Sequence, residues 1–296
     1  MLRMLKVFKD FAHDRDFYFS APPVRFETSL YPDGQPYVKY DGFGSDEEYS
    51  ILYVDADPVW HFHAGMMFAK SYIEVTGKPI KLVIPNFPGA RQDRRNMDGD
   101  VLFSAKYYAQ IVNSIGFDEV FVLDPHSDVT PALLDRVTPL HVGHIAQYDG
   151  LRAGVLFEYN YDAIVAPDAG AARRAYVMAA ALGVPRVLQA WKHRETATGK
   201  ISGFGVEDTK LLVDAWTPRL LVVDDMCDAG GTFVGLAPVL AEAYGAVVDL
   251  YVTHGLFTRG THELKKHYDR IITTNSTGSE KLNCEVIDVL DWKFYV

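Results

Sequence analysis

Short runs of consecutive apolar residues alternate along the chain with longer segments in which apolar residues recur every three or four positions. The short runs, of which 220–223 is one, are typical of strands that are buried on both faces. The longer segments have the spacing of helices with one apolar face. This pattern predicts strands within residues 49–56, 80–87, 119–126, 161–170, 184–191, 219–226 and 247–257, and helices within residues 58–77, 102–116, 171–183 and 232–245.

Strands that alternate with helices predict an α/β fold of mainly parallel sheets flanked by helices. The strand–helix units are about twice as many as one nucleotide-binding sheet needs. A division near residues 141–150 separates two similar halves, so we expect an N-terminal domain of residues 1–146 and a C-terminal domain of residues 147–296. Ligands of such sheets bind beyond the carboxyl ends of the strands, so the residues after each strand are the candidates for function.

The composition limits the classes of protein that fit. Hydrophobic residues make up 48% of the 296 residues, which is ample for a core. The net charge of −10 disfavours a nucleic-acid partner, because binding to a phosphate backbone needs clustered Lys and Arg. No apolar run is long enough to predict a membrane span or a secretory signal. Cys227 and Cys284 are the only cysteines, which indicates a reducing, cytoplasmic location.

Three acidic residues at and just after the end of the strand at 219–226 precede a glycine turn. Backbone N–H groups at the start of a helix form a cradle for phosphate. Carboxylates repel phosphate, so these acids must serve sugar hydroxyls or a magnesium ion, and the combination suits a phosphorylated sugar. A capped helix after a turn would explain one acid but not three. The residues of this stretch are Asp224, Asp225, Asp228, Ala229, Gly230, Gly231 and Thr232.

Cationic side chains follow two other strands. The stretch after residues 80–87 contains Arg91, Gln92, Asp93 and Arg94, and guanidinium groups are forked donors to phosphate oxygens. Taken alone, such a loop is more often a solvated surface. Lys192 and Arg194 lie two residues apart in an extended segment, so both can reach one phosphoryl group.

Two further strand ends have groups that suit a metal ion. Asp124 and His126 end the strand at 119–126, and Asp168 follows the strand at 161–166. Carboxylate oxygen is a ligand that Mg²⁺ prefers, together with water, whereas imidazole is a weaker choice.

Together these stretches resemble the ribose-phosphate pyrophosphokinase (phosphoribosyl-diphosphate synthetase) family, in family order. The acidic loop is similar to the ribose-phosphate motif that this family shares with phosphoribosyltransferases. The stretch "FPGARQDRR" and the Lys-x-Arg pair are similar to the pyrophosphokinases alone. The resemblance implies two phosphoribosyltransferase-like domains that transfer the β,γ-diphosphate of MgATP to the anomeric hydroxyl of ribose 5-phosphate, with release of AMP. A phosphoribosyltransferase or a non-catalytic homologue would not need both cationic stretches.

The resemblance also implies roles for the residues. Lys192 and Arg194 would stabilise the transferred group, and the acidic loop would bind the ribose phosphate. His126 and Asp168 would organise Mg²⁺. In relatives a loop like "YPDGQ" reaches the ATP site of a neighbouring subunit, which implies a homo-oligomer, either a dimer or a hexamer built of dimers. The residues implied in ATP binding are Arg91, Gln92, Asp93, Arg94, Tyr31, Asp33 and Gln35.

The chain departs from the family at two of these positions. Gln35 stands where the family has Glu, and Ala229 stands where it usually has Thr. The second change removes a hydroxyl donor and enlarges the phosphate pocket. An esterified phosphate has less charge and needs more room, so ADP-ribose is an alternative acceptor, as in divergent, phage-type relatives that resemble enzymes of NAD resynthesis. The change can also be neutral drift.

Overall fold

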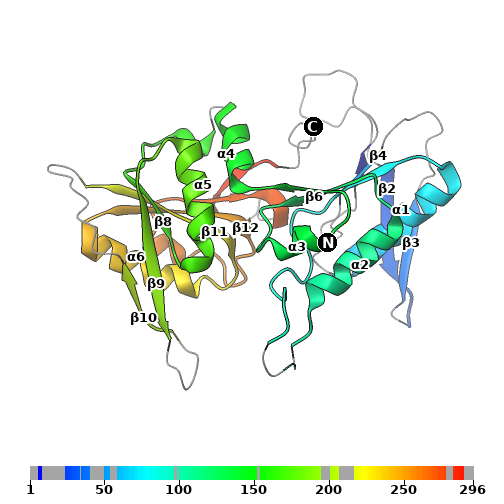
Figure 1. The fold of residues 1–296 in the computed structure, drawn as a ribbon, viewed down its shortest axis with the longest axis horizontal. Coiled ribbons are helices and arrows are strands. Elements are labelled where there is room, and N and C mark those ends of the chain that lie inside the picture. Colours follow the sequence, from blue (N-terminus) through cyan, green and yellow to red (C-terminus); the bar gives the residue numbers. More distant parts are fainter. Residues whose placement is uncertain are drawn as a thin grey trace. The chain divides into compact units, whose positions relative to one another are not determined.

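The computed structural model describes residues 6–8, 24–33, 35–40, 50–53, 59–96, 99, 101–151, 154–194, 201–206, 217–277 and 283–289. The chain divides into two compact units, Met1–Leu140 and His141–Val296. The sequence placed this division after residue 146. Each unit has its own sheet, and within the described residues each sheet has seven strands (Figure 1).

The sheet of the first unit has the order β3-β2-β1-β4-β5-β6-β7. Its parallel part was predicted in outline, whereas the antiparallel strands β1 to β3 were not. Parallel order continues from β4 to β7, so the carboxyl ends of these strands share one edge. The strands are β1 (Lys6–Phe8), β2 (Val24–Leu30), β3 (Pro36–Tyr40), β4 (Ser50–Tyr53), β5 (Ile80–Val83), β6 (Glu119–Leu123) and β7 (Val137–Leu140).

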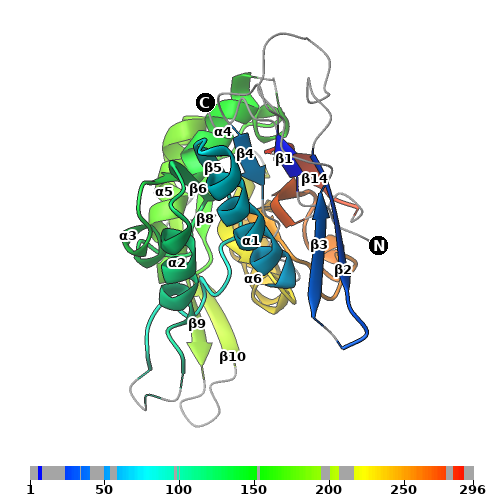
Figure 2. The same cartoon turned by 90° about the vertical axis from the view of Figure 1, so that its right-hand side faces the viewer.

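Helices α1 (Val59–Thr76) and α2 (Ser104–Ile115) lie side by side in the first unit, as Figure 2 shows. The buried side chains of α2, Ala105, Ala109 and Val112, recur at intervals of three and four residues, which is why this segment forms a one-sided helix. Ala109 and Val112 share one core with residues of β5 and β6. A short helix, α3 (Val129–Leu133), follows β6.

The sheet of the second unit has the order β10-β9-β8-β11-β12-β13-β14. Its strands are parallel except for the β9–β10 hairpin. The chain runs from β8 outward to β10 and then returns to β11 on the other side of β8, so β8 and β11 are neighbours at a switch point. The strands are β8 (Ala163–Ala166), β9 (Val187–Arg194), β10 (Ile201–Val206), β11 (Arg219–Cys227), β12 (Val247–Gly255), β13 (Ile271–Thr274) and β14 (Glu285–Ile287).

Helices cover both faces of this second sheet. Leu236 and Leu240 of α6 (Gly231–Tyr244) share a core with Val222 of β11. Helix α5 (Ala172–Leu182) contacts β8 and β11. The residues of β11 that alternate with Val222 belong to the opposite face of the sheet, and they are also buried. The remaining helices are α4 (Val142–Leu151), η1 (Val155–Phe157), η2 (Ala169–Ala171), η3 (Leu264–Lys266) and η4 (Asn275–Thr277). Within the described residues, no helix has the length and apolar character to cross a membrane.

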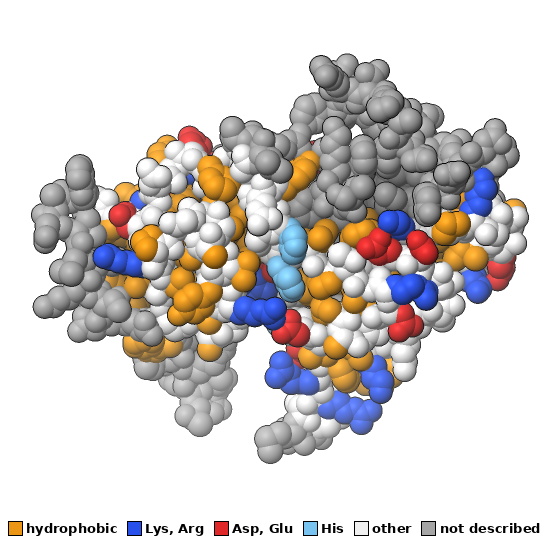
Figure 3. All heavy atoms as spheres, turned by 45° about the horizontal axis from the view of Figure 1, so that its top comes forward, with side chains coloured by type: hydrophobic (Ala, Val, Ile, Leu, Met, Phe, Trp, Pro, Cys, Tyr) orange, Lys and Arg blue, Asp and Glu red, His pale blue; other side chains and the backbone are white. Residues whose placement is uncertain are grey.

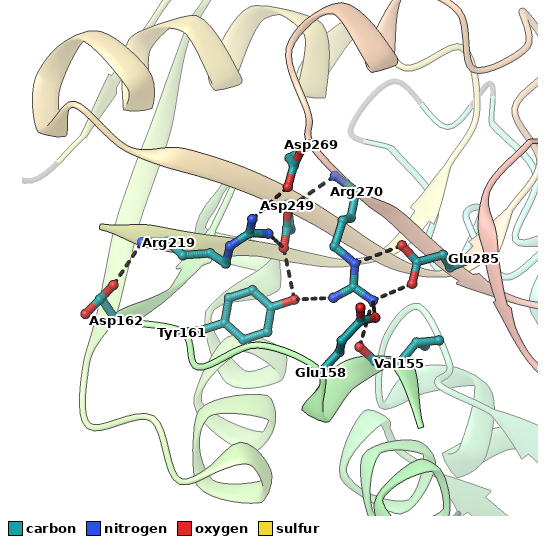
Figure 4. A network of polar contacts seen from close by, with 9 residues as sticks. All are labelled: Val155, Glu158, Tyr161, Asp162, Arg219, Asp249, Asp269, Arg270 and Glu285. Atoms are coloured by element: carbon teal, nitrogen blue, oxygen red, sulfur yellow. Dashed lines mark hydrogen bonds and ion pairs between the residues drawn. The ribbon is translucent and has the colours of Figure 1, made fainter. Parts of the chain in front are cut away.

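A polar network joins the amino ends of β11 to β14, as Figure 4 shows. Arg219 donates to Asp249 (Nη1 to Oδ2, 2.6 Å), and Tyr161 donates to the same carboxylate oxygen from 3.1 Å. Arg270 pairs with Glu285 (Nε to Oε1, 2.8 Å). Burial raises the pKa of Asp249, against the effect of its partners. This network lies at the edge away from the carboxyl ends of the strands, so we assign it to stability.

Candidate active site

The acidic residues predicted for the sugar and for magnesium come from two adjacent strands of the second sheet. Asp168 follows β8, and Asp224 and Asp225 lie near the end of β11. These strands pair in parallel at Val165 and Val222, and they flank the switch point of the sheet. A doubly wound sheet binds ligands in the crevice at that point.

An arginine whose side chain is largely buried faces this acidic pair. Nη1 of Arg174, in α5, lies 3.5 Å from Oδ1 of Asp224 and 3.9 Å from Oδ1 of Asp225. The side chain of Arg174 is 9% exposed, so it is held within the fold. This residue was not among those predicted from the sequence. The signal available was the Arg-Arg pair in the first turn of the helix that follows Pro167-Asp168.

The pKa of Asp224 is raised well above its usual value. Burial removes water from the carboxylate, and the neighbouring charge of Asp225 acts in the same direction. Arg174 opposes both effects without cancelling them. The ionised form of Asp224 therefore reduces stability, which is typical of a functional position.

Replacing Asp224 by asparagine is expected to raise the melting temperature at neutral pH and not at acidic pH. The folded pKa of Asp224 lies above the unfolded value, so its stabilising contribution is complete below the unfolded pKa and is lost as the pH rises through the folded pKa. The variant should melt about 2–4 °C higher at pH 8, the shift that about 1 kcal/mol gives, and like the wild type near pH 4.

Melting curves of both proteins between pH 4 and pH 8 measure this effect. Asp118→Asn, at an exposed position, is the matched control and should leave the pH dependence unchanged. A D224N protein that melts lower than the wild type at pH 8 would show that the ionised carboxylate stabilises the fold.

The glycine turn after β11 has the geometry of an anion cradle. Gly230 is the N-cap of α6 with a φ of 79°, a left-handed conformation that glycine adopts without strain. No side chain caps this helix start among the described residues. A Cβ on Gly231 would meet no atom within 4 Å, so open space lies beside the first-turn N–H groups. Ala229 and Gly231 are exposed, and Thr232 is half-buried.

The segment after β12 holds the cradle in place. Thr258 donates its hydroxyl to Oδ1 of Asp228 (2.8 Å) and its N–H to the carbonyl of the same residue (3.1 Å). The N–H groups of Leu256 and Phe257 both donate to the Cys227 carbonyl at 3.0 Å. Asp228 thus has a partner that fixes the loop, in addition to the role predicted for it.

Cys227 and His254 both belong to the core. Cys227 is fully buried, and burial raises the pKa of its thiol to about 12, so the thiol remains protonated. His254 is 3% exposed, and its Nδ1 lies 2.9 Å from Oγ of Ser276. Both observations favour packing over proton transfer.

Lys192 and Arg194 lie in β9, opposite Phe204 and Ile201 of β10. The extended conformation expected for this segment is therefore confirmed, but the side chains of both cations, and residues 195–200, lie outside what the structure describes. Aromatic rings lie against one glycine of this hairpin and one glycine of α6. A Cβ on Gly205 would overlap Trp191, and a Cβ on Gly235 of α6 would overlap Phe204.

Replacing Gly235 by alanine is expected to displace the hairpin. The new methyl group overlaps the Phe204 ring, and overpacking of this kind costs about 1–3 kcal/mol. Because Lys192 pairs with Phe204, the displacement should also lower turnover. Melting temperature and turnover measure the two effects. The smaller side chain of a G235A/F204L double variant should restore stability, and a G235A protein identical to the wild type would contradict the packing.

In the first unit, the loops after β5 and β6 meet. Asp93 is 5% exposed and pairs with Arg94 (Nε to Oδ1, 2.8 Å). The hydrogen bond from Arg94 lowers the pKa of Asp93 against the effect of burial, and Ser127 and His126 act in the same direction as Arg94. The predicted residues Asp93, Arg94 and His126 are thus neighbours, although they follow different strands.

Of the other predicted residues of this loop, one contacts α2 and the arginine side chains are exposed to solvent. Gln92 fastens the loop to α2, because its carbonyl accepts from the Ala105 N–H (3.3 Å) and its side chain accepts from Ser104. Arg91 is exposed, and the Arg94 side chain is 78% exposed despite its pairing.

Asp124, which was predicted at the end of the next strand, is buried and has a φ of 36° just after β6. The face drawn in Figure 3 shows Lys and Arg side chains among hydrophobic ones in this unit.

Tyr31, Asp33 and Gln35 of the "YPDGQ" stretch lie between β2 and β3. The N–H of Tyr31 donates to the Gln35 carbonyl at 2.8 Å, and the N–H of Gln35 donates to Oδ1 of Asp33 at 3.1 Å. The ring of Tyr31 is 51% exposed. These three residues are therefore presented together on one hairpin.

Asp168 fits one carboxylate ligand of a magnesium ion. Its Oδ1 accepts from the N–H groups of Gly170 (3.0 Å) and Ala171 (3.2 Å), which caps η2 and orients the carboxylate. No cluster of three His, Cys, Asp or Glu side chains suits a metal among the described residues. Mg²⁺ in phosphoryl-transfer sites needs only one or two carboxylates, with water and substrate phosphates as further ligands.

Residues 142–291 match the family described as phosphoribosyl transferase domain. The chain belongs to this family. Among curated phosphoribosyl transferase relatives, the ribose-phosphate pyrophosphokinase of Maricaulis maris is 26% identical over 82% of this chain and 75% of its own length. That of Pyrococcus furiosus is 28% identical over 86% of this chain and 87% of its own length. The resemblance inferred from the sequence is confirmed.

The fold is also confirmed by a solved structure. Phosphoribosylpyrophosphate synthetase from Mycobacterium smegmatis superposes with a TM-score of 0.74, at 20% identity, over 92% of this chain and 88% of that one. The prediction of an α/β fold of the phosphoribosyl transferase type was therefore right for both units.

Proposed function

We propose that this protein is a ribose-phosphate diphosphokinase, which transfers the β,γ-diphosphate of MgATP to the 1-hydroxyl of ribose 5-phosphate and releases AMP. The observation that carries the proposal is the extent of the match. The phosphoribosyl transferase domain covers residues 142–291, whereas relatives named ribose-phosphate pyrophosphokinase match most of the chain, including the first unit. A simple phosphoribosyltransferase has no use for that unit.

In this mechanism the second unit binds the acceptor. The N–H groups and the Thr232 hydroxyl at the start of α6 would hold the 5-phosphate, and Asp224 and Asp225 would orient the ribose hydroxyls. The first unit would bind ATP through Arg91, Arg94 and the "YPDGQ" turn of a neighbouring subunit, so the enzyme would act as a homo-oligomer.

Lys192 and Arg194 would stabilise the charge on the transferred phosphoryl oxygens, since phosphoryl transfer depends on positioning and charge neutralisation. Magnesium, held through Asp168 and His126 directly or by water, would neutralise phosphate charge when bound. The acceptor hydroxyl attacks the β-phosphorus, its proton leaves to solvent, and the bond to the AMP oxygen breaks.

Mass spectrometry of reaction products tests the proposal. With MgATP and ribose 5-phosphate, we expect AMP and a sugar that has gained a diphosphate. The formation of ADP would show a monophosphoryl kinase and overturn the proposal. The comparisons do not favour ADP-ribose as acceptor, so a parallel reaction with ADP-ribose should be slower; if it is faster, the acceptor has been misassigned.

A further inference from the structure

We propose that Arg174 is a positioning residue that reserves the Asp224–Asp225 pair for an uncharged vicinal diol and excludes a divalent cation from the pair. The inference rests on the proposed function and sharpens one point of it. Three acids at the end of β11 and just after it are compatible with sugar hydroxyls and with a magnesium ion, and the sequence leaves both open. The position of Arg174 decides between them.

The contacts of Arg174 are with both acids at once. Its Nη1 lies 3.5 Å from one Oδ1 and 3.9 Å from the other, so one guanidinium serves both carboxylates. The side chains of Arg174 and Asp225 are only 9% and 7% exposed, so the guanidinium group of Arg174 has little room to move out into solvent. Helix α5, which carries Arg174, contacts both β8 and β11 and fixes the arrangement.

A divalent cation bound by both carboxylates would lie close to this guanidinium. Like charges repel strongly where water is largely excluded, so the arginine disfavours such a cation. A diol has no net charge, and its hydroxyls donate hydrogen bonds to carboxylate oxygens without this repulsion. The same guanidinium also offsets the repulsion between the two like-charged carboxylates before the diol binds.

Manganese binding to the nucleotide-free protein tests cation exclusion separately from turnover. Electron paramagnetic resonance of free Mn²⁺ counts the ions bound per chain. We expect Arg174→Gln to bind an additional Mn²⁺ that the wild type does not bind. Arg174→Lys retains a cation and should resemble the wild type in this measurement. Arg173→Gln, at the exposed neighbouring position, is the matched control and should change nothing.

Steady-state kinetics test the positioning role. Arg174→Gln should raise the KM for ribose 5-phosphate on the order of tenfold, because carboxylates that have lost this ion-pair partner would hold the ribose hydroxyls less well. The change in kcat should be much smaller. Arg174→Lys should recover part of this loss. A general effect on folding would instead lower kcat, and Arg174→Lys would not reverse it.

A second variant keeps the proposal testable if Arg174→Gln does not fold. Asp225→Asn in the otherwise unchanged chain should weaken sugar binding and leave Mn²⁺ binding as in the wild type. If Asp225→Asn abolishes Mn²⁺ binding, or if a folded Arg174→Gln binds no more Mn²⁺ than the wild type, cation exclusion by Arg174 is wrong. These metal measurements stand even if no diphosphate transfer is found, so the two failures are distinguishable.

Discussion

Replacing Lys192 and Arg194 together by glutamine is expected to lower the rate of AMP formation by about 10⁴-fold or more. Loss of one preorganised donor to transition-state charge costs on the order of 10²–10³ in rate, and two such losses add in free energy when they act independently. Because the interactions form mainly in the transition state, the KM values should change little. Single-turnover measurement of AMP release with MgATP and ribose 5-phosphate checks the expectation.

His193→Gln provides the matched control for this pair. His193 lies between the two cations in β9, so this substitution alters the same strand without removing a cation. The H193Q protein should therefore turn over at a rate close to that of the wild type. If the double variant remains within tenfold of the wild type, then these cations do not stabilise the transferred group, and the proposed mechanism is wrong.

Replacing Gly231 by aspartate is expected to raise the KM for ribose 5-phosphate by about 10²-fold while leaving the fold intact. Gly231 is the first residue of α6, and a Cβ there meets open space. A carboxylate at a helix start is favourable by about 0.3–1 kcal/mol, so the melting temperature should stay the same or rise slightly. The same charge repels the phosphate from the cradle, where each hydrogen bond to a charged group contributes about 1.5–3 kcal/mol.

Gly231→Asn separates charge from size in this experiment. Its side chain has nearly the same volume as aspartate and no charge, so the rise in KM should be smaller, about tenfold. Isothermal titration with ribose 5-phosphate and with unphosphorylated ribose gives a second readout, because only the phosphorylated sugar should be affected by the charge. Equal effects of Asp and Asn on the phosphorylated sugar would show that the phosphate does not bind at the start of α6.

Much of the fold could be predicted from the sequence because hydrophobic periodicity is a local property. The runs that became β5, β6, β8, β11 and β12 are buried on both faces, and a buried strand has no polar face to interrupt the pattern. The antiparallel strands β1 to β3 were missed. Their segments contain charged and aromatic residues without a clear period, and their pairing depends on partners distant in the chain.

The sequence by itself determined which residues stand at the end of each strand, and with them the chemistry of the candidate site. Acids end β11 and a glycine turn follows it, and guanidinium groups follow β5. Only the tertiary structure decided which of these residues meet. Strand order places β8 beside β11, α5 brings Arg174 to the acidic pair, and the segment after β12 fixes Asp228 through Thr258. Such contacts join residues 30 to 50 or more positions apart, and their formation depends on the packing of whole elements, which no local pattern encodes.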